Sequence, residues 1–400
     1  MAKIALLGYG TIGQGVAEVF RVNVESIAKR AGEAIEIKYI LDLRDFPGDI
    51  NEDKVVHDYE VIVNDPEISV VVEMMGGIEP AYTFCKGALL AGKSVATSNK
   101  ALVIKHGAEL IAIAREKSLN FLFEASVGGG IPIIRPLISS LSADIVEEVS
   151  GILNGTTNYM MYQMTEHGLE FEDVLRKAQA KGYAEADPTA DIEGHDACRK
   201  IAILTSLIGG KQVDFEDIHC EGITKISAAD IKYAKAMGRK IKLLASSWLE
   251  GDTYSAMVSP VMLDVSHPLY NVEDVFNAVF VHGNMLGDAM FYGRGAGSLP
   301  TASAVAADVV DIVKHFGRNI AIEWKAEKMV LGDHRQAEFQ FFVRAKAEKS
   351  AIEAAFGPVE YVEIPDAADE TAFVTAKMSG LDYEEAAGKL DGIINMIRVK

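Results

Sequence analysis

Short apolar runs alternate with amphipathic helical patterns through the first third of the chain. The runs rich in branched aliphatic residues predict strands at 3–7, 37–41, 70–72, 94–97 and 120–123. Apolar positions with helical spacing predict helices from about residue 13, over 80–91 and over 101–117. Strands that alternate with helices form crossover units and build a parallel sheet. We therefore predict an α/β domain over residues 1–135 with a doubly wound parallel sheet.

The spacing of apolar positions along the chain changes after Pro136. Longer helical patterns follow, at 157–166, 170–181 and 195–208. Strand-like runs lie between and after them, at 146–153, 254–258 and 277–281. This pattern is typical of an α+β domain in which helices back a mixed or antiparallel sheet. We place this domain at 136–300 and expect the next helix, 301–316, to pack back on the first domain and complete it.

A small third module is predicted over residues 337–400. Strand-like runs lie at 339–343, 360–363, 372–377 and 394–399. Helical patterns lie at 347–355 and 383–391. The predicted order of elements is therefore βαββαβ.

Composition and charge narrow the range of partners. The formal net charge is −19, whereas nucleic acids and anionic membranes need a basic surface, so we expect neither as a partner. No apolar run is long enough to span a bilayer. The cysteines, Cys85, Cys198 and Cys220, form no close pair and no metal-binding spacing, which fits a reducing compartment. We expect a cytoplasmic protein.

The turn between the first predicted strand and helix fits the pattern G-x-G-x-x-G, with the sequence Gly8-Tyr9-Gly10-Thr11-Ile12-Gly13. The first glycine permits a tight turn, the second lets the backbone approach a pyrophosphate, and the third lets helix and strand pack closely. The phosphates then lie at the positive N-terminus of the helix. A purely structural glycine turn is the alternative. The strand–turn–helix context favours a Rossmann-like site for NAD or NADP.

The second predicted strand ends at Asp42, and Arg44 follows two residues later. An acidic residue at this place holds the ribose hydroxyls of NAD, whereas a nearby arginine pairs with the 2′-phosphate of NADP. Two solvated charges in a loop are an equal alternative. The cofactor preference stays open.

A lysine follows another strand of the predicted parallel sheet, in the segment Ser98-Asn99-Lys100. Open α/β sheets bind ligands at the carboxyl ends of their strands, where Lys100 can touch cofactor and substrate. The alternative is that Ser98 or Asn99 caps the next helix and that Lys100 is solvated.

Carboxylates crowd the loop from Gly182 to Asp196, and an apolar helix follows it. Asp196 and Lys200 are four residues apart, so they share one face of this helix. An exposed ion pair is the alternative, but the apolar surroundings favour a buried lysine that donates or accepts a proton. Binding of a divalent metal is an alternative role for these carboxylates, although the segment contains only one histidine, His195.

Several segments together resemble the homoserine dehydrogenase family: Gly8–Gly13, Ser98–Leu102, Gly151–Tyr159 and Lys181–Lys200. The resemblance extends over roughly residues 1–325. It implies NAD(P)-dependent interconversion of the small molecules homoserine and aspartate 4-semialdehyde, in threonine, methionine and isoleucine biosynthesis. It also implies a homodimer or higher homo-oligomer that associates through the second domain.

The resemblance assigns roles to individual positions. Lys200 matches the proton donor, and Lys100 the group that polarises the carbonyl and contacts the cofactor. The remaining matches are the substrate-binding residues Gly182, Glu185, Asp191 and Asp196, the cofactor-binding residues Ser98 and Gly295, and a sodium site formed by the backbone carbonyls of Glu124, Val127, Gly129 and Ile131. A glycine-rich hinge is the alternative for the last set.

The third module resembles a shortened ACT regulatory domain. After Arg344 the usual Asp-x-Pro-Gly turn is missing, and Ala345-Lys346-Ala347-Glu348-Lys349 stands in its place. Because that turn helps to form the effector pocket, we expect no feedback inhibition by threonine.

Two other functions compete with this interpretation. An acylating semialdehyde dehydrogenase needs an activated cysteine nucleophile, but Cys198 lies within a predicted helix and no other cysteine is suitably placed. A dinucleotide-sensing regulator uses the same fold without chemistry, and does not need the charged cluster around Lys200.

Overall fold

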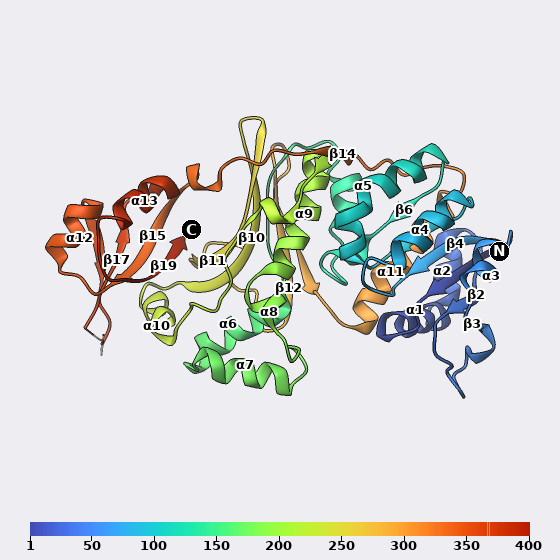
Figure 1. Cartoon of the computed structure of the whole chain (residues 1–400), viewed down its shortest axis with the longest axis horizontal. Coiled ribbons are helices and arrows are strands. Elements are labelled where there is room, and N and C mark those ends of the chain that lie inside the picture. Colours follow the sequence, from blue (N-terminus) through green and yellow to red (C-terminus); the bar gives the residue numbers. More distant parts are fainter. Residues whose placement is uncertain (366, 368) are drawn as a thin grey trace.

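The computed structural model describes residues 1–400 except 366 and 368. Three parts of the chain lie in a row: the N-terminal part in blue, the middle part in green and yellow, and the C-terminal part in red (Figure 1). Among the described residues, no helix is both long enough and apolar enough to cross a membrane.

The N-terminal part contains a fully parallel sheet in the order β3-β2-β1-β4-β5-β6. Its strands are β1 (Ala2–Leu7), β2 (Ile35–Leu41), β3 (Val55–Val56), β4 (Ile68–Glu73), β5 (Ser94–Thr97) and β6 (Phe121–Leu122). The strand order reverses between β1 and β4, and the carboxyl ends beside such a reversal are where these sheets bind ligands. The predicted Rossmann-like sheet is confirmed, with the short β3 added.

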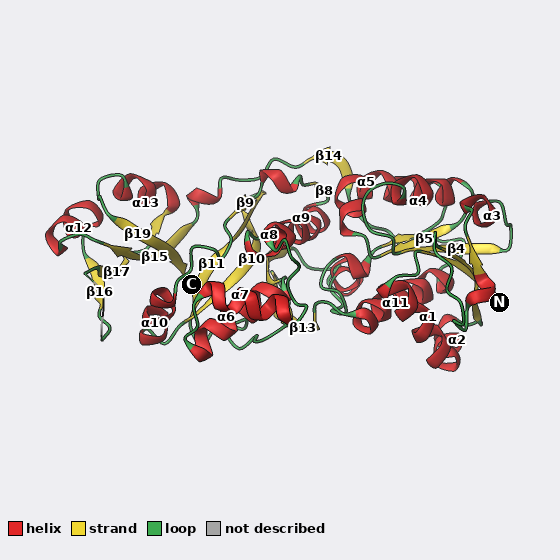
Figure 2. Cartoon of the chain, turned by 60° about the horizontal axis from the view of Figure 1, so that its bottom comes forward, coloured by secondary structure: helices red, strands yellow, loops and turns green. Residues whose placement is uncertain are grey.

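Helices cover both faces of this sheet. They are α1 (Thr11–Val22), α2 (Val24–Ala31), α3 (Tyr59–Val63), α4 (Ala81–Leu90), α5 (Lys100–Glu116) and α11 (Ser298–Lys314). Figure 2 shows α3, α4 and α5 on one face and α1, α2 and α11 on the other. Helix α11 comes from far along the chain and packs against α1 and α2. The domain boundaries inferred from the sequence stay predictions.

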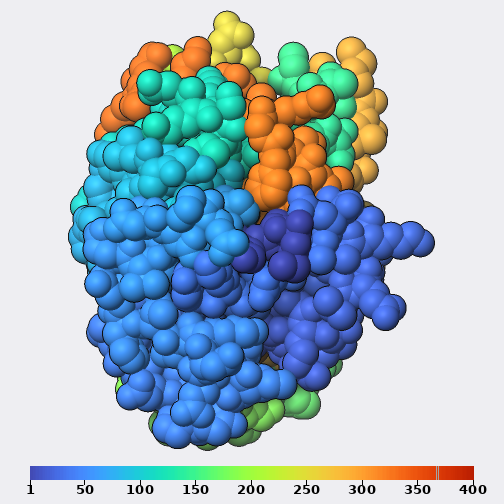
Figure 3. Space-filling model, turned by 90° about the vertical axis from the view of Figure 1, so that its right-hand side faces the viewer, coloured from blue at the N-terminus to red at the C-terminus, as the bar shows by residue number. Residues whose placement is uncertain are grey.

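The chain that follows α11 runs along the N-terminal part, where it appears in orange (Figure 3). Asn120 fixes it there: its side chain donates to the carbonyl oxygen of Arg318 at 3.0 Å and accepts from the amide of Ile320 at 2.7 Å. These two hydrogen bonds hold the segment against the N-terminal part.

The second sheet has 11 strands, in the main order β13-β12-β7-β10-β11-β19-β15-β17-β16. Its middle part consists of β7 (Val146–Ile152), β9 (His219–Cys220), β10 (Lys240–Glu250), β11 (Thr253–Leu263), β12 (Phe276–Gly283) and β13 (Gly287–Arg294). The helices of this part are α6 (Gly155–His167), α7 (Phe171–Ala180), α8 (Thr189–Ile192), α9 (His195–Gly209) and α10 (Ala228–Ala236). A separate short pair joins β8 (Lys211–Gln212) to β14 (Lys325–Lys328).

The C-terminal part has the predicted βαββαβ order. Its elements are β15 (Glu338–Ala345), α12 (Lys349–Phe356), β16 (Val359–Val362), β17 (Thr371–Thr375), α13 (Gly380–Ala387) and β19 (Ile393–Val399), with the short β18 (Met378–Ser379) before α13. β19 also pairs in parallel with β11, through Val261 with Arg398 and Met262 with Val399. The middle and C-terminal parts therefore share one sheet, which the sequence did not predict. The likeness to an ACT domain stays a prediction.

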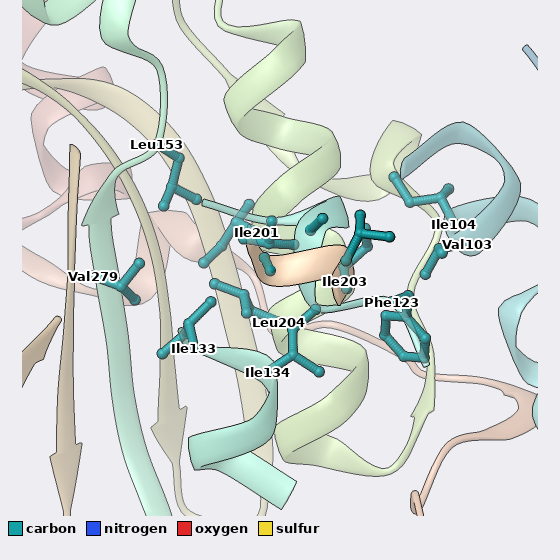
Figure 4. Close-up of a cluster of buried hydrophobic side chains, with 14 of the residues drawn as sticks. Val103, Ile104, Phe123, Ile133, Ile134, Leu153, Ile201, Ile203, Leu204 and Val279 are labelled. Atoms are coloured by element: carbon teal, nitrogen blue, oxygen red, sulfur yellow. The ribbon is translucent and has the colours of Figure 1, made fainter. Parts of the chain in front are cut away.

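The helix α9 lies at the centre of the molecule. Its apolar residues, among them Ile201, Ile203 and Leu204, are fully buried. Figure 4 shows these side chains packed between Val103 and Ile104 of α5 on one side and Val279 of β12 on the other. Burial of this apolar face fixes α9 between the two sheets and confirms the prediction of a buried helix.

Candidate active site

The glycine motif forms the connection between β1 and α1. Gly8 has a φ of +94°, which favours glycine, and a Cβ there would lie 3.1 Å from the carbonyl oxygen of Met74. At Gly13 a Cβ would lie 2.2 Å from the carbonyl oxygen of Gly8, so the helix can pack this close only with glycine. Nothing lies within 4 Å of a Cβ at Gly10, which leaves its backbone open to a ligand. These features fit a pyrophosphate at the N-terminus of α1.

Asp42 and Arg44 form an ion pair beside this turn. The Asp42 carboxylate accepts from the Arg44 Nε at 2.9 Å and from the backbone amide of Tyr9 at 2.9 Å. The hydrogen bond from the Arg44 guanidinium is the main reason why the pKa of Asp42 lies well below its ordinary value. Both residues line a cleft of about 530 Å³ that also includes Gly8 and Gly10. Asp42 is thus largely buried and paired, whereas Arg44 is paired but remains exposed to solvent. The cleft fits the ribose end of a dinucleotide.

The loop before α5 is held by Glu73, a residue that the sequence interpretation missed. Glu73 is fully buried at the end of β4 and accepts from Thr97 Oγ1 at 2.5 Å. Asn99 caps α5 by accepting from the amide of Leu102 at 3.1 Å, as the alternative interpretation predicted. Lys100 follows this cap directly, so the buried carboxylate and the cap together fix the start of α5. The signal in the sequence was an acidic residue that directly follows the apolar strand-like run 70–72.

Asp196 joins both candidate lysines. Its carboxylate accepts from Lys100 and, at 2.7 Å, from Lys200, which also donates to the carbonyl oxygen of Leu153 at 2.7 Å. Burial alone would raise the pKa of Asp196, but the Lys200 and Lys100 ammonium groups outweigh it and hold the pKa well below its ordinary value. The side chain of Lys200 is only 12% exposed, so the alternative of an exposed Asp196–Lys200 ion pair is wrong. The side chain of Lys100 is 39% exposed, so it pairs with Asp196 and also contacts solvent.

Asn154 links the acidic loop to this cluster. Its side-chain amide donates to Asp191 at 2.7 Å and to Asp196 at 2.9 Å. Burial, followed by the nearby Asp196 charge, raises the pKa of Asp191 above its ordinary value in spite of the hydrogen bond from Asn154. The sequence marked the segment around Asn154 as distinctive but gave this residue no role in the site.

These residues surround one cleft of about 610 Å³ between the two sheets. The lining residues include Ile12, Ser98, Lys100, Asn154, Gly182, Asp191, Asp196, Lys200 and Gly295. The end of the glycine turn and the lysine pair therefore face the same space. A dinucleotide on the turn and a small polar molecule near Lys200 can meet there.

Comparison with known proteins identifies the family of this chain. Residues 8–124 match the family described as "Homoserine dehydrogenase, NAD binding domain", and residues 132–310 match "Homoserine dehydrogenase". A homoserine dehydrogenase from Synechocystis sp. is 45% identical over 320 residues, which cover 78% of this chain and 73% of that protein. The chain belongs to the homoserine dehydrogenase family.

Other relatives agree with this assignment. A homoserine dehydrogenase from Corynebacterium glutamicum is 44% identical over 325 residues, which cover 79% of this chain and 73% of that protein. A crystal structure of a homoserine dehydrogenase from Thiobacillus denitrificans superposes with a TM-score of 0.90 at 33% identity, over 100% of this chain and 98% of that one. A hyperthermophilic archaeal homoserine dehydrogenase in complex with NADPH has a TM-score of 0.66 at 27% identity, over 78% of this chain and 97% of that one.

The predicted sodium loop of this family member follows β6. The buried Glu124 side chain accepts from the amides of Ile133 at 2.6 Å and Arg135 at 2.7 Å, which ties the loop into a closed turn. Gly129 packs against the loop of Gly295, where a Cβ would lie 2.4 Å from a carbonyl oxygen. The loop therefore connects the two halves of the cleft, as the alternative of a glycine-rich hinge requires. Sodium binding by the carbonyls of this loop stays a prediction.

Two predicted substrate-binding residues, Gly182 and Glu185, differ in their position relative to the cleft. Gly182 lines the cleft with a φ of +72°, which favours glycine. Glu185 is exposed and is not one of the residues that line the cleft. Its role as a substrate-binding acid stays a prediction.

The arrangement of the cysteines differs from the sequence interpretation. Cys85 is buried in α4, and none of the cysteines lines the cleft that contains Lys200. Cys198 and Cys220 are far apart in the sequence but near each other in the fold, because both lie at Gly194: a Cβ there would lie 3.1 Å from the Cys220 sulfur, and the Gly194 carbonyl oxygen accepts from the Cys198 amide at 2.9 Å. The spacing of the cysteines could not show this, since it is the pairing of β9 with β11 that brings Cys220 over α9.

Proposed function

We propose that this protein interconverts L-homoserine and L-aspartate 4-semialdehyde with NAD or NADP. The single observation that carries the proposal is the buried Lys200 ammonium, held beside Lys100 in the cleft that also contains the end of the glycine turn. The relatives named as homoserine dehydrogenases support it. When bound, the dinucleotide supplies or accepts the hydride.

Lys200 is the proton donor in the direction of aldehyde reduction. An ammonium group has three N–H donors, and Lys200 uses two of them, on Asp196 and on the carbonyl of Leu153. The third is free to donate to the substrate oxygen as negative charge develops there. Because this charge grows only in the transition state, the interaction accelerates the reaction rather than merely holding the substrate. Lys100 polarises the same carbonyl from the other side of Asp196.

The acidic loop binds the amino end of the substrate. Asp191 and Asp196 present carboxylates to the cleft, and Gly182 leaves room beside them. A carboxylate pairs with an ammonium group through charge-assisted hydrogen bonds. Asn154 keeps the two acids at a fixed separation, so the ammonium and the reacting carbon are placed together.

The cofactor lies along the glycine turn, with its ribose end at Asp42 and Arg44. The pair with Asp42 already holds Arg44 at the cleft, so its positive charge lies near the place of the 2′-phosphate of NADP. Steady-state kinetics with NAD and NADP decide the preference, and Arg44→Ala should raise the KM for NADP more than that for NAD.

Sodium binds to the backbone carbonyls of Glu124, Val127, Gly129 and Ile131. Carbonyl oxygens are hard ligands of the kind that suits such a cation, and the closed turn held by the Glu124 side chain keeps them in place. Replacement of sodium by a bulky organic cation should raise the KM of the substrate without changing the fold.

The protein is a cytoplasmic homodimer that associates through its second domain. β13 lies at one edge of the large sheet, and its exposed side includes Met290 and Tyr292, with Met285 and Leu286 in the preceding turn. An exposed apolar edge strand is a template for pairing with a second copy. The free thiols fit a reducing compartment such as the cytoplasm.

Absorbance of the reduced nicotinamide tests the reaction directly. Homoserine added to the protein with NAD or NADP should produce the absorbance of the reduced cofactor, without any need for phosphate. Aspartate semialdehyde that reduces the cofactor only with phosphate would show an acylating dehydrogenase instead. No change with either substrate would contradict the proposal.

A further inference from the structure

Cys198 of α9 and Cys220 of β9 come together on one face of α9. The Cys220 thiol donates to the carbonyl oxygen of Glu193 at 3.3 Å, and the Cys198 thiol donates to that of Phe215 at 3.3 Å. A Cβ at Gly194 would lie 3.1 Å from the sulfur of Cys220, so glycine makes room for this side chain. Cys198 is four residues after Gly194 and lies on the same helix face. This placement brings the two sulfurs close enough for each thiol to affect the pKa of the other.

The two thiols differ in access. Cys198 is buried, whereas Cys220 is half-buried and lines a cleft of about 480 Å³. The cleft lies between the segment that follows β9 and β19, which contributes Asn395 and Met396. A small oxidant that enters this cleft therefore reaches Cys220 first and finds Cys198 behind it.

The thiols also differ in their readiness to ionise. The neighbouring Cys198 thiol lowers the pKa of the Cys220 thiol, while Cys220 and burial raise the pKa of the Cys198 thiol. A thiolate is the form that attacks an oxidant, and a neighbouring thiol then resolves the product. The accessible sulfur is thus the nucleophile and the buried sulfur is the resolving group.

We propose that Cys198 and Cys220 form a dithiol that a hydroperoxide oxidises to a disulfide, and that this disulfide slows the enzyme. The Cys220 thiolate attacks the peroxide and becomes a sulfenic acid, while the peroxide is reduced and leaves as hydroxide or alkoxide. The Cys198 thiol then displaces the sulfenic hydroxyl. The S–S bond forms, the S–O bond breaks, and water carries away the oxygen and the proton.

The position of Cys198 on α9 explains the effect on turnover. It lies midway between Asp196 and Lys200 on the same helix. A disulfide has an S–S length of about 2.05 Å, so two neighbouring free thiols must approach further when it forms. This draws the first turns of α9 toward β9 and away from Lys100, which belongs to the other half of the cleft. The formation of the disulfide is independent of the proposed function, whereas its effect on turnover rests on it.

Oxidation of the full chain tests the proposal. The reduced protein is treated with hydrogen peroxide, its mass and free thiols are measured, and the linked peptides are identified. We expect a mass loss of about 2 Da, the loss of both thiols, and a linkage between Cys198 and Cys220. Turnover of homoserine should fall by roughly 10-fold or more, because a misplacement of ~1 Å can cost ~100-fold, and a thiol reductant should restore it.

The third cysteine provides a matched control. Cys85→Ser should behave as the unaltered protein, Cys198→Ser should stop at a sulfenic acid on Cys220 that dimedone captures, and Cys220→Ser should form neither product. Peroxide that forms no Cys198–Cys220 linkage, or that inactivates Cys220→Ser equally, would overturn the proposal. A disulfide that leaves turnover unchanged would overturn its regulatory part. Reduced protein without homoserine activity would refute the proposed function, while the mass measurement would still decide whether the disulfide forms.

Discussion

Two buried clusters of charge lie in different regions of this chain, one in the active cleft and one beneath the C-terminal part. In the cleft, Asp196 accepts from Lys100 and Lys200. Beneath the C-terminal part, Arg344 of β15 is bound between Asp230 of α10 and Glu370. Both clusters join segments that are far apart in the sequence.

The clusters differ in whether they face a cleft. Arg344 uses Nε and Nη2 on Glu370 and Nη1 on Asp230 and Ser227, and its side chain is only 9% exposed. Lys200 keeps one N–H donor unused and lines a cleft. An enclosed cluster can only hold segments together, whereas a cluster that lines a cleft and has a donor to spare can act on a ligand. Burial of charge alone therefore does not identify a catalytic group.

Lys200→Ala gives the largest effect expected from this comparison. Turnover should fall by about 10²–10⁴-fold because the proton donor is lost. The dissociation constant of the cofactor, measured by fluorescence titration, should change little. Lys211→Ala, which removes an exposed lysine paired with Glu327, is the control and should keep full turnover. Undiminished turnover of Lys200→Ala would remove this lysine from the chemistry.

Arg344→Ala tests the enclosed cluster. Removal of one partner leaves Asp230 and Glu370 buried without their cation, which should lower the free energy of unfolding by about 3–5 kcal/mol. Denaturant titration measures this change, and turnover of the remaining folded protein should be nearly normal. Arg335→Ala removes an exposed arginine that pairs with Asp333, and stability should hardly change. A loss of turnover without a loss of stability would contradict the distinction between the clusters.

The pH dependence of substrate binding tests Asp191, the neighbour of the cleft cluster. Because its pKa is raised, the carboxylate takes up a proton as the pH falls toward that value and loses its attraction for the substrate ammonium. The KM for homoserine should therefore rise at a pH above the ordinary Asp range of about 4. The ionised carboxylate also destabilises the native state at neutral pH, so Asp191→Asn should be at least as stable and should have a high KM at every pH. Asp187→Asn, an exposed acid of the same loop, should keep the normal profile.

Threonine should have the smallest effect. The loop after β15 lacks the turn that the resemblance to ACT domains calls for, and it packs against Gly392 through a hydrogen bond from the Lys346 amide at 2.9 Å. Saturating threonine should leave the initial rate of homoserine oxidation unchanged. Strong inhibition would show that the C-terminal part does more than hold the sheet together.

The sequence predicted those features that depend on local patterns. The alternation of strands and helices, the glycine turn and the buried face of α9 follow from periodicity over short windows. The lysine pair was reached through the spacing of Asp196 and Lys200 and through the family resemblance. Position at the carboxyl end of a strand correctly marked Lys100 as a residue of the cleft.

Features that depend on distant segments were missed. Nothing in the sequence shows that Lys100 and Asp196 share a hydrogen bond, since 96 positions separate them. The proximity of Cys198 on α9 and Cys220 on β9 was missed for the same reason. Glu73 and Asn154 act by hydrogen bonding to other site residues, and such contacts exist only after the chain has folded.

The pairing of β19 with β11 has a consequence for the growing polypeptide on the ribosome. Until residues 393–399 have been synthesised, the backbone of Val261 and Met262 lacks its neighbouring strand. An open sheet edge attracts other extended chains, so the nascent protein is exposed to misassembly over this interval. The dinucleotide-binding sheet has no such dependence on late residues, although its covering helix α11 also arrives from far downstream. Chaperone demand during translation should therefore be concentrated on the middle of the molecule.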